Sequence, residues 1–146
     1  MTRLANGIFA GFVATVVLSV LMIMKQMMGM MPDLNVIAML THMSGASSPV
    51  VGWVMHFMIG SVIWGGLFAF FYDRIPGGSA MLKGAVFGIG AWLLMMVMVM
   101  PMAGAGLFGL DFGMAAPVMT LMLHVIFGIA LGLTYGARAE HAPAGA

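Results

Sequence analysis

The segments that decide the fold are PVVGWVMHFMIG, residues 49–60, and PVMTLMLHVIFG, residues 117–128. In each, a proline is followed seven residues later by a histidine and four residues after that by a glycine. Both lie in apolar stretches long enough to cross a bilayer, for which about 20 residues suffice. Because ionisable residues inside a membrane are costly and usually face a partner or a cavity, the two histidines form a candidate functional site.

Composition predicts an integral membrane protein. Of the 146 residues, 63% are hydrophobic and 6% are charged, whereas soluble domains carry roughly 25% charged residues. Four crossings use nearly the whole chain, so we expect one transmembrane domain over residues 1–146, an all-α polytopic four-helix bundle. The net charge of +1 gives no reason to expect nucleic acid as a partner, and the absence of cysteine excludes disulfides and thiolate chemistry.

Four spans are predicted at about residues 7–24, 50–71, 84–100 and 118–135. Prolines mark their limits, because Pro49 and Pro117 suit a first helical turn and Pro101 stops the third span. The first span is expected to be retained, because no small-residue cleavage site follows it. Residues 103–113 are glycine-rich and predict an irregular connection at the membrane surface, and residues 136–146 predict a short polar tail.

A short interfacial helix is predicted between the first two spans. Residues 33–44 place apolar side chains such as Ile37 and Leu40 on one side and His42 on the other. Asn35 or Asp33 could cap its start and Gly45 could end it. The expected role of this helix is a lid lying flat on the bundle.

Spacing also indicates an internal duplication. The residues Gly7, Gly11 and Ala14 recur 77 residues later as Gly84, Gly88 and Ala91, and the two histidines are 68 residues apart. We therefore expect two tandem helical hairpins in the same orientation, residues 5–73 and 82–137. A duplicated gene explains such a pattern without any function.

Glycines at four-residue spacing predict close helix packing. In lipid, small residues let helix backbones approach, because packing rather than hydrophobicity drives association there. We expect the glycines of the second and fourth spans to draw these two spans together, so that His56 and His124 meet. The residues assigned to helix packing are Gly7, Gly11, Gly60, Gly84, Gly88, Gly128 and Gly132.

Basic residues predict the orientation. Four of them share one side of the membrane and Lys25 alone lies on the other, which favours cytoplasmic termini. The four are Arg3, Arg74, Lys83 and Arg138. Each histidine then lies about two turns, roughly 10 Å, below the outer surface.

Methionine suggests a soft-metal site. The chain has 20 methionines, and all but Met1 and Met81 fall in the outer half or the outer connections. Thioether and imidazole ligands suit Cu(I). The candidate ligands are His56, His124, Met55, Met58, Met119 and Met122. Methionine is also a flexible filler of apolar contacts, which is the competing interpretation.

Several functions stay open. Haem b would need the second and fourth spans held apart at the histidines. A structural or accessory subunit would use the two rings as a mutual hydrogen bond, with another membrane protein or a second copy as partner. A carrier of a small solute, lipid or quinone is a further alternative. Because no nucleophile with a base and no carboxylate pair lies in the spans, we expect no enzymatic activity, and His42 and His141 are expected to be solvated.

Residues 52–65, GWVMHFMIGSVIWG, and 90–113, GAWLLMMVMVMPMAGAGLFGLDFG, resemble small four-span bacterial membrane proteins of unknown function. The resemblance covers most of residues 5–137. It implies an inner-membrane location and a compact four-helix form. It brings no substrate and no catalytic residues.

Overall fold

The computed structural model describes residues 2–140, and this part of the chain is all-helical. The four predicted spans are confirmed, and each is somewhat longer than predicted. The first span is α1 (Arg3–Met27); the second is α3 (Pro49–Met58), η1 (Ile59–Trp64) and α4 (Gly65–Phe71); the third is α5 (Ala80–Leu94), η2 (Met95–Val99) and α6 (Met100–Met102); the fourth is α7 (Ala116–Glu140). Residues 141–146, including His141, lie outside the described residues.

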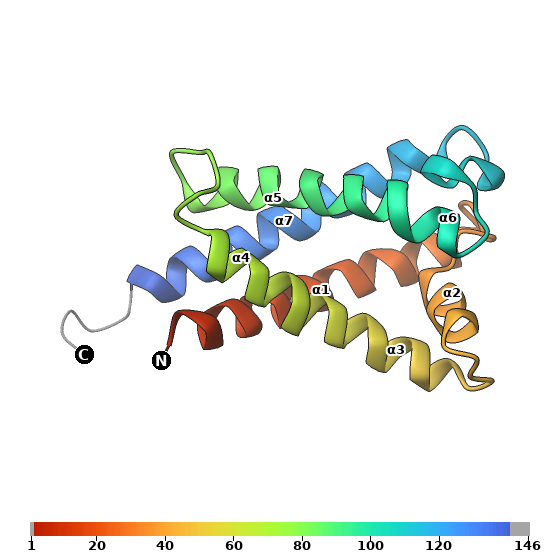
Figure 1. Ribbon diagram of the computed structural model, residues 1–146, viewed down its shortest axis with the longest axis horizontal. Helices are drawn as coiled ribbons and strands as arrows, with labels where there is room; N and C mark the ends of the chain where they lie inside the picture. Colours follow the sequence, from red (N-terminus) through yellow and green to blue (C-terminus); the bar gives the residue numbers. More distant parts are fainter. Residues whose placement is uncertain (1, 141–146) are drawn as a thin grey trace.

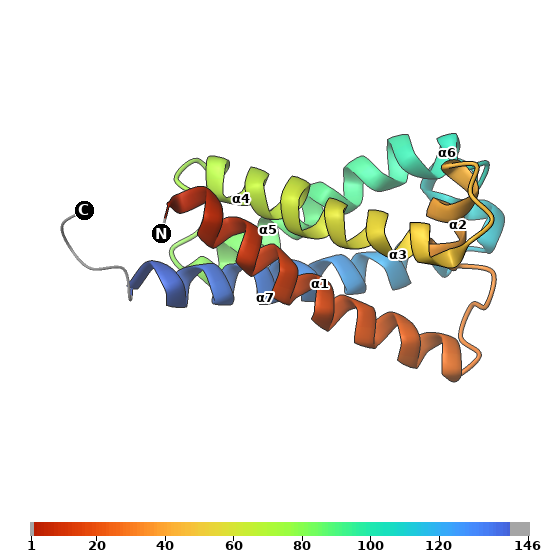
Figure 2. The ribbon, with the colours of Figure 1, turned by 90° about the horizontal axis from the view of Figure 1, so that it is seen from below.

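The start of α1 and the end of α7 lie at one end of the bundle, here called the termini end, and α2 (Val36–Met43) lies at the other, the α2 end (Figure 1). The first and fourth spans pack against each other, the second packs on the first, and the third packs on the fourth. At the α2 end the helices splay. There, α3 lies away from α5 and α6 (Figure 1). In the perpendicular view, the end of α1 also lies away from α6 (Figure 2).

Glycines hold each hairpin together. In the first hairpin, a Cβ on Gly7 would overlap the backbone oxygen of Gly65, and Gly11 lies against the backbone of residue Gly60. In the second hairpin, a Cβ on Gly84 would overlap the backbone oxygen of Gly128, and one on Gly132 would overlap that of Ala80. Only glycine permits these backbone approaches, so the predicted packing role of the glycines within each hairpin is confirmed.

The glycines do not join the second span to the fourth, and this part of the sequence prediction was wrong. Gly60 packs on Thr15 of α1, whereas Gly128 packs on Gly84 and Gly88 of α5. Each stripe therefore faces its own hairpin partner, because adjacent antiparallel helices offer the longest continuous contact. The duplication of the hairpins stays a prediction.

The predicted interfacial helix is confirmed as α2. Asn35 caps it, since its side-chain oxygen accepts a hydrogen bond from the Ala38 backbone N–H at 3.0 Å. The helix ends before Gly45, whose φ of +71° is left-handed. Ile37 and Leu40 are buried, as the periodicity predicted, and His42 is exposed.

Two π-helical turns interrupt the second and third spans, and the sequence pattern did not predict them. In η2, the Met100 N–H donates to the Met95 carbonyl, five residues back. Pro101 follows at once, and a proline removes one helical hydrogen bond and crowds the carbonyl four residues before it, which accounts for the wider turn. The irregular connection after this span is confirmed by the 3₁₀ helix η3 (Leu107–Phe112), with left-handed Phe108 and Gly109.

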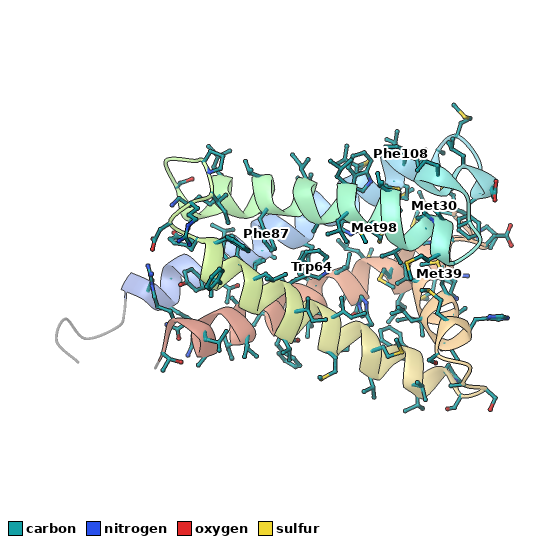
Figure 3. The ribbon with its side chains drawn as sticks, viewed as in Figure 1. Met30, Met39, Trp64, Phe87, Met98 and Phe108 are labelled. Atoms are coloured by element: carbon teal, nitrogen blue, oxygen red, sulfur yellow. The ribbon has the colours of Figure 1, made fainter. Side chains whose placement is uncertain are left out.

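Two apolar clusters fill the bundle. The cluster toward the termini end centres on Phe68, Phe127 and Leu131. The cluster at the α2 end centres on Met96 and Met100, both fully buried. Figure 3 shows Trp64 and Phe87 meeting between the second and third spans, with Met30 and Met39 at the α2 end. Much of the methionine at this end is therefore packing material, as flexible thioethers suit irregular gaps.

Polar contacts tie the spans together at the termini end. Arg3 pairs with Asp73 at 2.8 Å. The Lys83 ammonium donates to the Tyr72 carbonyl at 2.8 Å. Arg138 donates to the Asn6 side chain at 3.2 Å, from a helix that continues past its predicted end to Glu140. These contacts fix the ends of the hairpins while the α2 end stays open.

We expect Gly88→Ala to destabilise the protein, because the new Cβ would overlap the His124 carbonyl oxygen. Overpacking of this kind costs about 1–3 kcal/mol. The matched control is Gly90→Ala on the same helix, where a Cβ has open space and alanine raises stability by up to about 1 kcal/mol. Thermal unfolding in one detergent measures both. Equal stability of the two variants would contradict tight packing of α5 on α7.

Asp73 gives a prediction for acid pH. Its hydrogen bonds with Arg3 hold the pKa of the Asp73 carboxyl below its ordinary value of 3.8. The stabilisation is therefore complete above pH 3.8 and is lost as the pH falls through the lower, folded-state value. At neutral pH, Asp73→Asn should have a lower free energy of unfolding than the parent. This difference should become smaller only under strongly acid conditions. Unfolding across pH measures this, with Asp111→Asn as the control. A difference that is constant down to the acid limit would contradict the ion pair.

Candidate functional site

A cavity of about 400 Å³ lies in the α2 half of the bundle, between the two apolar clusters. All four spans and α2 contribute to its wall. Most of the lining is apolar, and the polar side chains stand out. They are Thr15, Lys25, Gln26, Asn35, His56, Thr120 and His124. The helices splay at this end, which is why a space remains that side chains do not fill.

His56 lines the cavity from α3 and is 7% exposed. Its Nε2 lies 3.2 Å from the Ser19 hydroxyl oxygen. The Ser19 hydroxyl donates its own proton to the Thr15 carbonyl at 2.7 Å, and a hydroxyl has only one proton to give. Ser19 therefore accepts from His56, which places the proton of the neutral ring on Nε2 and leaves Nδ1 unprotonated.

His124 lines the same cavity from α7 and is half-buried. Its Nδ1 lies 2.8 Å from the Thr120 carbonyl oxygen. A carbonyl can only accept, so Nδ1 of the neutral ring carries the proton. The Nε2 atom of His124 is therefore unprotonated, and it forms no hydrogen bond with any described residue.

The two histidines thus line one cavity, but they do not bond to each other. Within residues 2–140, each ring has a separate partner, Ser19 or Thr120. The mutual hydrogen bond of the structural alternative is absent from this geometry. Each ring instead offers one free lone pair, the arrangement in which a histidine can bind a metal or accept a hydrogen bond from a ligand.

The four methionines proposed as ligands are not among the residues that line the cavity. Met58 and Met122 are 54% and 57% exposed on the outer surface. Met119 packs against the cluster at the α2 end, and Met55 is half-buried on α3. The methionines that do line the cavity are Met22, Met39 and Met95. The four methionines lie one, two or five residues from their histidine, and such steps turn a side chain about 100–200° around the helix, away from the space beside the histidine.

Ser19 and Lys25 belong to the site, and their spacing in the sequence does not reveal this. Ser19 is 37 residues from His56, and an isolated serine in a span is an ordinary packing residue. In the sequence, Lys25 stands out as a single charge at the end of an apolar run. The same charge is equally well explained as a signal for the orientation of the first span in the membrane. Their roles depend on how α1 crosses the second span.

Four long apolar helices that enclose this cavity define a multi-pass helical membrane protein. The model of a family of unknown function, DUF6789, matches residues 1–144. The chain belongs to this family, which confirms the resemblance to a four-span membrane family of unknown function. The bacterial origin stays a prediction. Neither the curated proteins nor the solved structures contain a match to this chain.

The two ring protonation states can be measured. We expect ¹⁵N spectra of histidine-labelled protein to show His56 protonated on Nε2 and His124 on Nδ1, each favoured about tenfold, the equivalent of one hydrogen bond. Ser19→Ala removes the acceptor of His56 only, so its preference should fall while that of His124 stays. If both rings respond alike to Ser19→Ala, the assignment is wrong.

Proposed function

We propose that this protein binds a small, mainly apolar organic molecule in the cavity, and that His56 and His124 accept hydrogen bonds from it. One observation carries this proposal: two imidazoles from different spans line a single cavity of about 400 Å³, each with one unprotonated nitrogen. Cavities of about 300–1,000 Å³ typically hold organic ligands. A single ion needs its ligands within a few ångströms of one point, and the space is larger than that requires.

The chemistry of the lining favours a ligand with a hydroxyl group. The Thr15 hydroxyl donates to the Gly11 carbonyl at 2.7 Å, and the Thr120 hydroxyl donates to the Ala116 carbonyl at 2.7 Å. Their protons are used, so each oxygen can only accept, and the Thr120 oxygen already accepts from the Trp92 indole N–H at 3.1 Å. With the two imidazole nitrogens, these groups select a molecule that donates, such as a phenol, a quinol or another membrane-soluble alcohol.

A binding or carrier role follows more readily than catalysis. Ser19 does lie beside His56, contrary to the sequence expectation that no serine has a base nearby, but its hydroxyl donates to the Thr15 carbonyl and accepts from His56, so His56 does not act as its base. The basic residues favour cytoplasmic termini in a bacterial inner membrane, which would place the cavity near the outer surface. A membrane-soluble ligand could reach it from the bilayer. An accessory role beside another membrane protein, or a second copy, is compatible with the same site.

A metal-containing ligand is the second candidate. Histidines that bind metals usually donate their other ring N–H to a carbonyl or similar group, and both imidazoles do so. Met22, Met39 and Met95 bring thioether sulfur to the same wall, which suits Cu(I). Haem b is also supported, because Gly60 and Gly128 pack within separate hairpins and do not force the two histidines together.

The test compares an alkylphenol with its methyl ether, which has the same body and no donor. We expect the phenol to bind about tenfold more tightly, the equivalent of one hydrogen bond. His124→Leu and His56→Leu should each reduce this preference, and Met122→Leu, on the exposed surface, should not. Titration calorimetry in detergent measures all four proteins.

The same preparations separate the two candidates. An absorption spectrum with a Soret band, or stoichiometric copper lost in both histidine variants, would select the metal-containing ligand. Equal binding of phenol and ether, in metal-free protein, would contradict the hydroxyl proposal.

A further inference from the structure

The polar groups of the cavity are not spread evenly. Lys25, Gln26 and Asn35 belong to the last turn of α1 and the start of α2, at the α2 end. Thr15 lines the cavity ten residues before Lys25 on the same helix, which is about 15 Å away along the axis. Trp64, toward the middle of the bundle, contacts Phe87 with ring centroids 5.8 Å apart. The cavity therefore has a polar end beside Lys25, and its opposite end, beside Trp64, is apolar.

Lys25 places a positive charge at the polar end. Its side chain is 7% exposed. Its ammonium nitrogen donates to three backbone carbonyls of the connection before α2, those of Met30 at 3.2 Å, Met31 at 3.0 Å and Leu34 at 2.7 Å. These bonds satisfy the three N–H groups, but carbonyls are neutral and do not balance the charge.

No carboxylate lies within ion-pair distance of Lys25 in the described part of the chain, where the ion pair formed is that of Arg3 with Asp73. Asp33, on the connection itself, is exposed. A buried charge is expensive unless it is paired, and an ionisable residue within a span is a functional candidate by default. A cavity borders this one, so a counter-charge has room to bind.

We infer that the ligand of this cavity is an amphipathic anion, whose carboxylate or phosphate lies beside Lys25 while its apolar body extends toward the histidines and Trp64. This inference rests on the proposed function, since it specifies the ligand of the same cavity. The anionic group can belong to a free amphipathic acid or to an acidic lipid, and the two sources share the same recognition chemistry.

Lys25 could instead serve only to hold the connection before α2. Lys25→Gln separates the two roles, because an amide still donates to carbonyls but carries no charge. The matched control is Lys83→Gln at the termini end, where the ammonium likewise donates to a backbone carbonyl, that of Tyr72 at 2.8 Å. Lys25→Arg keeps the charge and serves as the second variant if Lys25→Gln unfolds.

The experiment uses the full chain in phosphatidylcholine nanodiscs and two probes, a long-chain (hydroxyphenyl)alkanoic acid and its primary amide. We expect the acid to bind at least about tenfold more tightly than the amide to the parent, to Lys83→Gln and to Lys25→Arg. In Lys25→Gln the two probes should bind equally. Displacement of the acid by phosphatidylglycerol would assign the anion to a lipid headgroup, and retention of the acid would assign it to a free amphiphile.

Equal binding of acid and amide to the parent would overturn this inference and leave the hydroxyl-binding function standing. A preference that survives in folded Lys25→Gln would overturn it as well. If neither probe binds the parent, both the inference and the proposed function fail.

Discussion

Backbone contact at glycines is the constraint on which the rest of this structure depends. Within each hairpin, Gly7 against Gly65 and Gly84 against Gly128 bring two helices closer than any side chain would allow. In a membrane, where lipid tails compete with apolar side chains, such close packing supplies much of the association between helices. These contacts lie toward the termini end, where polar bonds such as Arg138 with Asn6 also join the spans. Toward the α2 end, the hydrogen bonds between helices of the described residues, such as that of Trp92 with the Pro117 carbonyl, stay within one hairpin. The two hairpins therefore diverge there and a cavity remains.

Methionine illustrates how one residue type can serve both packing and binding. Met96 and Met100 are fully buried in an apolar cluster and are explained by packing alone. Met22, Met39 and Met95 face the cavity and remain available as soft ligands or as apolar wall. Composition cannot separate these two groups, because Met95, which faces the cavity, directly precedes the buried Met96 in η2.

The chemical character of the site depends on where the hydroxyl and imidazole protons go. Ser19, Thr15 and Thr120 each give their proton to a backbone carbonyl one turn earlier. Their oxygens can then only accept, and two of them already do so, Ser19 from His56 and Thr120 from Trp92. The free ring nitrogens of the two histidines are the main acceptors left for a ligand. An apolar cavity with acceptors in its middle and an unbalanced cation at its polar end has a definite preference in ligands, although its residues are individually ordinary for a membrane helix.

The sequence by itself determined the class of protein, the four spans and the capped helix α2, and it singled out His56 and His124 as candidates. These follow from local properties: apolar length, proline and glycine positions, helical periodicity and the cost of an ionisable group in lipid. Only the tertiary structure decided which helix each set of glycines contacts, that the histidines line one cavity without a hydrogen bond between them, and which methionines face it. It also brought Ser19 to His56 and enclosed Lys25 in three carbonyls. Such facts depend on the rotation and splay of each helix against its neighbours. A rotation of one residue step, about 100°, moves a side chain from the cavity to the lipid without changing the pattern that predicts the helix.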